Sequence, residues 1–169
     1  MTRIGLLSDT HGCLDERIIE HLSQCDEVWH CGDFGNSQVA DRLAELHTLR
    51  GVYGNIDSGM VRYEFPEFLA FRCEQVNVLM THIGGYPGHY TPQVYHRLIN
   101  MRPQLFVCGH SHILKVQYDR SLSLLAMNPG AAGNFGIHTV RTLLRFEIDG
   151  DKIQNLEVVE MPKHCEELL

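Results

Sequence analysis

The sequence IGLLSDTHG, residues 4–12, decides the fold. Its apolar half, Ile4 to Ser8, predicts a buried strand. Its polar half places Asp9 and His11 at the carboxyl end of that strand. Apolar residues at helical spacing over residues 18–22 then predict a helix. The chain therefore opens with a strand that delivers polar side chains at its tip and continues into a helix.

The same order of apolar strand and polar tip occurs twice more in the first third of the chain. Glu27 to Cys31 leads into Gly32-Asp33, and Thr48 to Tyr53 leads into Gly54-Asn55. A helix that starts at Asn36 or Ser37 is expected between them. Such a βαβαβ unit implies parallel strands with right-handed connections, and ligands gather outside the carboxyl ends of such strands. We expect the three tips to share one edge.

The rest of the chain is richer in strands. Val76 to Thr81 leads into His82, and Leu105 to Cys108 leads into His110 and His112. A helix is expected to begin at Thr91-Pro92 and to end at Pro103, because Pro suits the first helical position. The other predicted strands are Phe68 to Glu74, Leu114 to Tyr118, Leu122 to Met127, Thr142 to Ile148 and Ile153 to Val159.

So many strands do not fit in one sheet flanked by three helices. Two mixed sheets packed face to face, with the helices on the outside, bury the apolar runs better. The predicted fold is therefore an α/β four-layer sandwich, α/β/β/α. A chain of 169 residues fits a single domain, here residues 1–169.

Composition excludes several classes of protein. The net charge is −7 and no Lys/Arg cluster is present, so a long nucleic acid is not an expected partner. The six cysteines form no Cys-x-x-Cys pair, which argues against a zinc knuckle, and we predict reduced, mostly buried thiols. The N-terminus has no signal-peptide core and no apolar run approaches the ~20 residues of a membrane helix. We expect a cytoplasmic protein without a membrane partner.

The polar strand tips have the residue types of a metal site. Asp9 and His11 are two positions apart at a strand end, and His110 and His112 repeat this spacing. A period of two points both members of a pair to the same side. Imidazoles mixed with carboxylates favour a transition metal over calcium or magnesium. The expected ligands are Asp9, His11, Asp33, Asn55, His82, His110 and His112.

Taken together, these motifs resemble the signature of the calcineurin-like metallophosphoesterases. The resemblance spans nearly the whole chain. Within that superfamily, the chain is similar to the small bacterial and archaeal phosphodiesterase branch. The family resemblance also implies the four-layer sandwich. The motifs that carry it are Asp9-x-His11 within Ser8–Gly12, Gly32-Asp33, Gly54-Asn55, His82, Gly109-His110-Ser111-His112 and Asn128-Pro129-Gly130.

The resemblance implies two divalent metal ions, with Asp33 as the bridging ligand. It assigns Asp9, His11, Asp33 and His112 to one ion, and Asp33, Asn55, His82 and His110 to the other. Manganese is the favoured ion, and family members also use iron, zinc, nickel or magnesium. The implied reaction is in-line attack on phosphorus by a metal-bridging hydroxide, without a protein nucleophile. Asp33, Asn55 and His82 are the expected catalytic residues.

One position departs from the family pattern. Relatives that act on unactivated esters carry His directly after the Asn of the second metal, where it is thought to protonate the leaving alcohol. The compact branch commonly has Cys, whereas this chain has Ile56. Isoleucine has no proton to give, so no donor for the leaving group is identified. We expect slow turnover of esters with poor leaving groups and better turnover of aryl esters.

Four further features are expected near the site or in the core. Asp57 either orients a ligand from behind or caps the local turn. His89 and His138 are candidate substrate contacts or substitute acids, although exposed histidines in loops are usually only solvated. Ile83 to Tyr90 is rich in glycine and aromatic residues and is expected to face the substrate. His30 lies within a strand and should bond to a backbone partner in the core.

The predicted function is hydrolysis of small phosphodiesters. Monoesters carry more charge and prefer cationic side chains, yet no Arg lies next to a motif, which mildly favours diesters. One alternative is a phosphomonoesterase that uses the same site. Another is a metal-binding scaffold with little activity, similar to the retromer scaffold subunit. The protein is expected to be a monomer or a homodimer.

Overall fold

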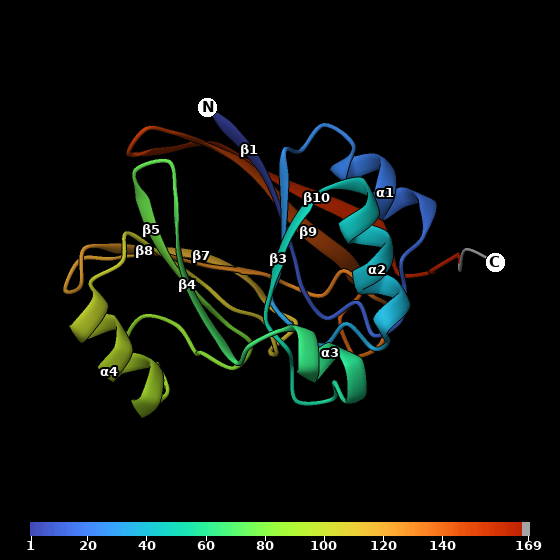
Figure 1. Ribbon diagram of the computed structural model, residues 1–169, viewed down its shortest axis with the longest axis horizontal. Helices are drawn as coiled ribbons and strands as arrows, with labels where there is room; N and C mark the ends of the chain where they lie inside the picture. The colour runs from blue at the N-terminus through green and yellow to red at the C-terminus, as the bar shows by residue number, and fades with distance from the viewer. Residues whose placement is uncertain (167–169) are drawn as a thin grey trace.

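The computed structural model describes residues 1–166 as two five-stranded mixed sheets with helices on their outer faces (Figure 1). The first sheet has the order β10-β9-β1-β2-β3 and the second has the order β4-β5-β6-β8-β7. The strands of the first sheet are β1 (Thr2–Leu7), β2 (Glu27–His30), β3 (Thr48–Gly51), β9 (Val140–Asp149) and β10 (Lys152–Pro162). Those of the second are β4 (Phe68–Cys73), β5 (Val76–Thr81), β6 (Leu105–Val107), β7 (Leu114–Asp119) and β8 (Leu124–Pro129).

The helices are α1 (Glu16–Leu22), α2 (Ser37–Leu46), α3 (Gly59–Glu64) and α4 (Pro92–Met101). Helices α1 and α2 lie on the first sheet, and α4 lies on the second (Figure 1). Side chains cap three of them, because Asp15, Asn36 and Thr91 each accept a hydrogen bond from a backbone N–H in the first turn. The four-layer prediction is confirmed. The short helix α3 was not predicted.

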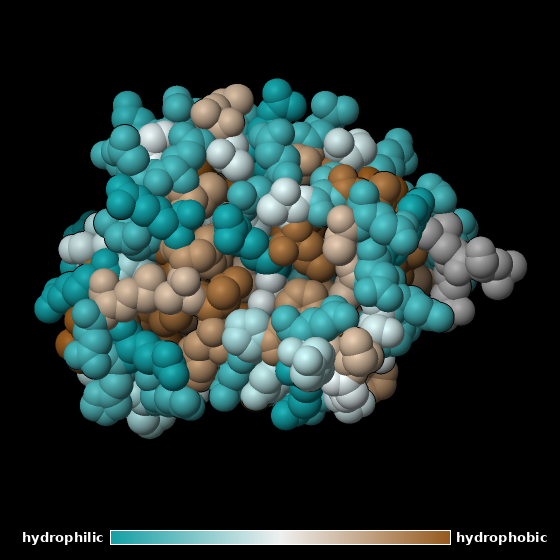
Figure 2. All heavy atoms as spheres, in the orientation of Figure 1, coloured by the Kyte–Doolittle hydropathy of each residue, from teal (hydrophilic) through white to brown (hydrophobic). Residues whose placement is uncertain are grey.

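The core consists of three apolar layers that follow from the alternation of side chains along each strand. In β6, Leu105 and Val107 pack between the two sheets, whereas Phe106 packs under α4. In β1, Leu6 faces the space between the sheets and Leu7 faces α1 and α2. Seen from the same direction as Figure 1, apolar side chains emerge in the middle of the face, surrounded by hydrophilic ones (Figure 2).

The strand directions place the polar tips at one end of the sandwich. Strands β1, β2 and β3 are parallel in the first sheet, and β5 and β6 are parallel in the second. This confirms the parallel βαβαβ opening. The loops after these five strands therefore carry the predicted site residues.

The cysteine prediction is wrong for one pair. Cys13, in the loop after β1, forms a disulfide with Cys165, which follows β10, at a sequence separation of 152. The loop after β1 and the segment after β10 come together because β10 pairs with β9, which in turn pairs with β1. Cys25, Cys31, Cys73 and Cys108 are free, and all but Cys25 are buried.

Residues 1–166 contain no helix long and apolar enough to span a bilayer.

Candidate metal centre

All seven predicted ligands lie just beyond the carboxyl ends of strands and gather in two neighbouring groups. One group consists of Asp9 and His11 after β1, with His112 after β6. The other consists of Asp33 after β2, His82 after β5 and His110 after β6. Within each group the potential ligand atoms lie within 4.8 Å of one another. Asn55, from the loop after β3, joins the second group through its side-chain oxygen.

Asp33 lies between the two groups. Its Oδ2 atom is 3.4 Å from Nε2 of His11 and 3.2 Å from Nε2 of His82. Its Oδ1 atom accepts a hydrogen bond of 3.1 Å from the backbone N–H of Ile56, which fixes the orientation of the carboxylate. One oxygen of Asp33 is thus held by the backbone, while the other faces imidazoles of both groups.

Asp9 is the buried carboxylate of the first group. Its Oδ1 atom lies 3.1 Å from Nε2 of His112. Its Oδ2 atom accepts hydrogen bonds from the Ser8 hydroxyl at 2.6 Å and from the His110 backbone N–H at 3.0 Å. Burial alone would raise the pKa of Asp9, but the imidazoles of His11, His112 and His82 outweigh it and hold the pKa well below its usual range. Asp9 is therefore ionised at neutral pH.

The second group brings nitrogen and oxygen atoms that can ligate a metal close together. Nδ1 of His82 is 2.7 Å from the carbonyl oxygen of Cys31, which can only accept, so this nitrogen carries the proton of the neutral ring. Nε2 of His82 then presents a lone pair, 3.0 Å from Oδ1 of Asn55 and 3.2 Å from Oδ2 of Asp33. Three acceptor atoms in such proximity call for a cation.

Two further observations fit a metal ion. Nε2 of His11 is buried without a hydrogen-bond partner in the part of the chain that the structure describes, although it faces Asp9 and Asp33. Burial would lower the pKa of His82, but the carboxylates of Asp33 and Asp9 outweigh it and raise that pKa. The site therefore stabilises positive charge, and its mixture of nitrogen and oxygen donors suits a transition metal.

Left-handed backbone aims several of these donors. Five of the seven have positive φ, namely Asp9 (55°), His11 (47°), Asp33 (58°), His110 (71°) and His112 (61°). Positive φ is uncommon outside glycine and costs on the order of 1 kcal/mol or more at each position. Such strain clusters at functional sites, where the surrounding structure maintains it.

Residues behind the donors hold the loops in register. Asp57 accepts hydrogen bonds from the backbone N–H groups of Gly54 (2.8 Å), Gly35 (3.1 Å) and Phe34 (3.2 Å). It thus joins its own turn, as one of the two predicted roles requires, to the loop that carries Asp33. Asn128 donates to the carbonyl oxygen of Gly109 at 2.9 Å and to the Ser111 hydroxyl at 3.1 Å. The roles of Ser8 and Asn128 were not predicted.

The two histidines predicted to contact substrate have different surroundings. The His138 ring lies 5.4 Å from the His112 ring, and its Nε2 is 2.8 Å from the carbonyl oxygen of Gly133. His89 lies outside both donor groups, with its ring 4.7 Å from that of Tyr86. His30 is fully buried, and its Nδ1 accepts a hydrogen bond from the Gly32 N–H at 3.1 Å, as predicted for a core histidine.

A third cluster of potential ligands, Cys13, Asp15 and Cys165, is already occupied by protein contacts. The two cysteines are bonded to each other, and Asp15 forms a buried ion pair with Arg141 at 2.7 Å. No free ligand set is left there.

Known proteins are similar to this chain in sequence or in fold. A probable metallophosphoesterase of Methanothermobacter thermautotrophicus is 25% identical over 155 residues, which cover 89% of this chain and 88% of that protein. The structure of an archaeal phosphodiesterase is similar, with a TM-score of 0.72 and 20% identity over 93% of this chain and 99% of that one. The structure of Vps29 from Entamoeba histolytica complexed with Zn²⁺ has a TM-score of 0.72 at 14% identity, covering 96% of this chain and 99% of that one.

The family assignment rests on the sequence. Residues 2–151, from β1 to the turn before β10, match the sequence model of the calcineurin-like phosphoesterase superfamily domain. This stretch contains all seven donors of the candidate metal centre. The chain therefore belongs to the calcineurin-like phosphoesterase superfamily.

Proposed function

We propose that this protein is a dinuclear metal-dependent phosphoesterase that hydrolyses small phosphodiesters. The position of Asp33 carries the proposal. Its Oδ2 atom is 3.4 Å from His11 and 3.2 Å from His82, so one carboxylate oxygen is close to donors of both groups. An oxygen in such a position suits a ligand shared by two cations.

Each proposed metal ion would have four protein ligands. Asp9, His11, Asp33 and His112 would hold the first ion, and Asp33, Asn55, His82 and His110 would hold the second. Two divalent ions would lower the pKa of a water molecule and neutralise charge on the phosphoryl oxygens. Manganese is the ion that we propose first. Zinc is a second choice, supported by the similar Vps29 structure complexed with Zn²⁺.

The chain's own residues contribute mainly orientation. The carbonyl oxygen of Cys31 fixes the His82 tautomer, so that Nε2 is free to bind an ion. Within residues 1–166, no lysine or arginine is hydrogen bonded to any of the seven donors. Fewer cationic side chains favour a diester over a more highly charged monoester. The similar archaeal structure, described as a phosphodiesterase, supports the same choice.

Metal reconstitution tests the proposal. The protein is stripped with a chelator and reloaded with Mn²⁺ or Zn²⁺, and its metal content is measured by mass spectrometry. We expect two ions per chain and hydrolysis of bis(p-nitrophenyl) phosphate in preference to p-nitrophenyl phosphate. Asp33→Ala should bind less metal and lose activity by more than the roughly 10- to 100-fold effect typical of a residue that only orients a ligand.

Asp41→Ala is the matched control, because Asp41 is an exposed acid on α2 that belongs to neither donor group. Its activity and metal content should equal those of the parent protein. Unchanged activity in Asp33→Ala would contradict the dinuclear proposal.

Two alternatives predict different results from the same measurements. A phosphomonoesterase would prefer p-nitrophenyl phosphate. A metal-binding scaffold would take up two ions and hydrolyse neither ester, an alternative favoured by the fold likeness to Vps29.

A further inference from the structure

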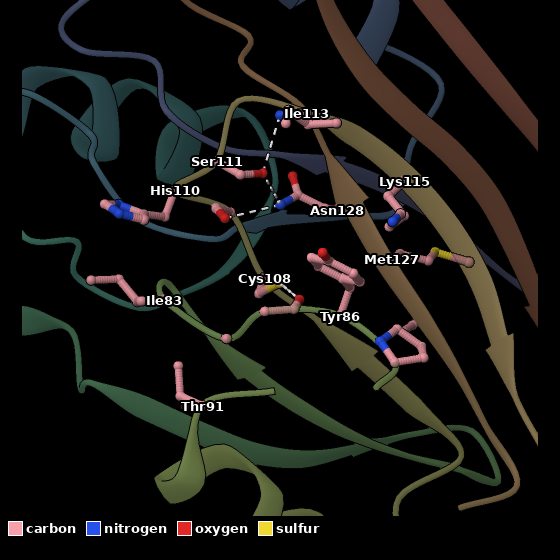
Figure 3. A pocket seen from close by; sticks show the side chains of 15 residues that line it. Ile83, Tyr86, Thr91, Cys108, His110, Ser111, Ile113, Lys115, Met127 and Asn128 are labelled. Carbon is pink, nitrogen blue, oxygen red and sulfur yellow. Dashed lines mark hydrogen bonds between the residues drawn. The ribbon is translucent and has the colours of Figure 1, made fainter. Parts of the chain in front are cut away.

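A cavity of about 350 Å³ opens beside the second donor group. His110 lies at one end of it and Lys115 at the other, with Tyr86 and Asn128 between them (Figure 3). Its volume is near the lower end of the range for sites that bind small organic molecules. A molecule held by the metal centre at His110 would have its remaining atoms next to this cavity.

The walls of the cavity are mostly apolar. Ile83 and Tyr86 come from the loop after β5. Ile113 directly precedes β7, and Met127 lies in β8. Tyr86 is 41% exposed and Ile113 is 64% exposed. Apolar side chains that remain in water gain free energy when an apolar ligand covers them. The walls therefore favour an apolar organic group.

The loop that carries Tyr86 has a defined shape. Gly85 has a φ of 84°, and a side chain at Gly84 would collide with the ring of Phe106. The carbonyl oxygen of Gly84 accepts a hydrogen bond from the Thr91 N–H at 3.1 Å, and that of Gly85 accepts one from the Cys108 thiol at 3.4 Å. The aromatic wall is thus held in place without a ligand.

Lys115 supplies the positive charge at the far end. Its ammonium nitrogen lies 3.8 Å from the centroid of the Tyr86 ring. Across residues 1–166 it forms neither an ion pair nor a hydrogen bond with a protein group. An anionic group at this end of the cavity would meet an ammonium that no carboxylate neutralises.

We propose that this cavity binds the organic group of the phosphoester, and that this group is an aromatic ring with an acidic substituent. The ring lies against Tyr86 and Ile113, and the acidic substituent reaches Lys115. The inference rests on the proposed function, because it requires the phosphoryl group to be held beside His110. It narrows the substrate class from small phosphodiesters in general to those with an acidic aryl group.

Three phosphonates that differ in one feature at a time test the assignment. Methylphosphonate has no ring, phenylphosphonate adds the ring, and 4-carboxyphenylphosphonate adds the acid. Affinity for the manganese-loaded protein is measured by calorimetry, which does not depend on turnover. We expect phenylphosphonate to bind at least about 10-fold tighter than methylphosphonate, equivalent to about 1.4 kcal/mol. The carboxylate should add a further gain of several fold.

Variants assign each gain to a side chain. Tyr86→Ala should remove most of the difference between phenylphosphonate and methylphosphonate. Lys115→Met should remove only the gain from the carboxylate. Tyr95→Ala is the matched control for the first variant, because Tyr95 is 46% exposed on α4 and does not line the cavity. Lys152→Met, at the exposed start of β10, is the control for the second.

A metal-independent measurement separates this inference from the proposed function. Benzoate carries the ring and the acid without a phosphonate, and it should shift the amide NMR signals of Gly85, Tyr86 and Ser111 in metal-depleted protein. These shifts should be absent in Tyr86→Ala. Shifts with benzoate but no binding of any phosphonate would retain the cavity assignment and overturn the metal centre. Equal affinity for the methyl and phenyl ligands, or no shifts with benzoate, would overturn the cavity assignment.

Discussion

At the scale of single residues, the candidate centre depends on side chains that never face the substrate. Asp57 accepts three backbone hydrogen bonds and thereby joins the turn after β3 to the loop after β2. Those two loops carry Asn55 and Asp33, a proposed ligand of the second ion and the proposed bridge. The distance between these two proposed ligands is therefore set by the carboxylate of Asp57.

Asp57→Asn should weaken metal binding with only a moderate loss of stability. The amide places N–H groups where a carboxylate oxygen now accepts from a backbone N–H, so at least one buried bond is lost at a cost of about 1–3 kcal/mol. We expect manganese affinity to fall about 10- to 100-fold, as for other residues that orient ligands. Calorimetry and urea unfolding measure the two effects.

The control is Asp26→Asn, since Asp26 also accepts a backbone hydrogen bond, from Arg3 at 2.8 Å, but lies away from the donors. Equal manganese affinity in the two variants would show that Asp57 does not set the ligand geometry.

Ile56 lies directly after the proposed ligand Asn55, and its backbone contacts the centre. Its N–H donates to Asp33, while its side chain is 46% exposed. We expect Ile56→His to raise turnover of methyl phosphodiesters by up to roughly 10²- to 10⁴-fold, because general acid catalysis contributes on that order. Esters of p-nitrophenol should gain little, since this leaving group does not require a proton.

Ile56→Ala is the matched variant that removes the side chain without adding an acid. If it raised turnover of the methyl ester as much as Ile56→His does, the gain would come from space and not from proton donation.

At the scale of elements, a buried ion pair joins the start of α1 to β9. Asp15 caps α1 through the Ile18 N–H and contacts Arg141 at 2.7 Å. Arg141 is fully buried and also donates to the carbonyl oxygens of Pro162 and Ala132. The loop between β1 and α1 contains His11, so the Asp15–Arg141 pair anchors the end of the loop that carries this member of the first donor group.

Breaking this pair should be costly. Asp15→Asn leaves the buried charge of Arg141 without its counter-charge, and Arg141→Met does the same to Asp15. Each variant should lower the free energy of unfolding by about 3–5 kcal/mol. The double variant should lose less than the sum of the two. Urea unfolding measures all three. The exposed Arg42–Glu45 pair is the control, and Arg42→Met should cost less than about 1 kcal/mol.

Low pH should remove the stabilisation that the Asp15–Arg141 ion pair provides. Burial would raise the pKa of Asp15, but the hydrogen bonds from Arg141 and Ile18 outweigh it and lower that pKa. A lowered pKa in the folded protein means that the stabilisation is present above the unfolded value, about 3.9, and is lost as the pH falls through the folded pKa. The stability difference between the parent and Asp15→Asn should therefore shrink below about pH 4.

The elements themselves were largely predictable, whereas their cross-connections were not. Strand β5 runs from Val76 to Thr81 as predicted, because an apolar run bounded by polar residues is a local signal. Helix α3 escaped prediction because only Val61 of its six residues is buried, which leaves no apolar stripe. Two of the three backbone partners of Asp57, Phe34 and Gly35, lie more than 20 positions away in the sequence, so local patterns cannot identify them.

At the scale of the whole molecule, the candidate centre lies at the junction of the two sheets. The first donor group takes Asp9 and His11 from loops of the first sheet and His112 from the second. The second group takes Asp33 and Asn55 from the first sheet and combines them with histidines of the second. Each proposed ion would therefore link both halves of the sandwich.

Manganese should accordingly stabilise the folded chain. A ligand that binds only the folded state at 100 times its dissociation constant adds about 2.7 kcal/mol per site. We expect the melting temperature to rise with manganese concentration and to fall after chelation. Calcium, which prefers oxygen ligands, should raise it less. A melting temperature independent of manganese would argue against metal binding at this junction.

The cavity and the disulfide show what the sequence does not specify at this scale. Tyr86 comes from the loop after β5 and Lys115 from β7, and they meet only in the folded protein. Cys13 and Cys165 carry no spacing motif, and only the pairing of β10 with β9 and of β9 with β1 brings them together. Both features depend on tertiary contacts between distant segments.

The Cys13–Cys165 bond also changes the covalent topology of the chain. With a separation of 152 positions, it closes a covalent ring that includes the helices α1 to α4 and the strands β2 to β10. A protease that cuts any one loop inside this ring opens it without releasing a fragment. The nicked protein stays a single covalent molecule until a reductant is added. The two segments on either side of the cut therefore remain tethered and can refold together.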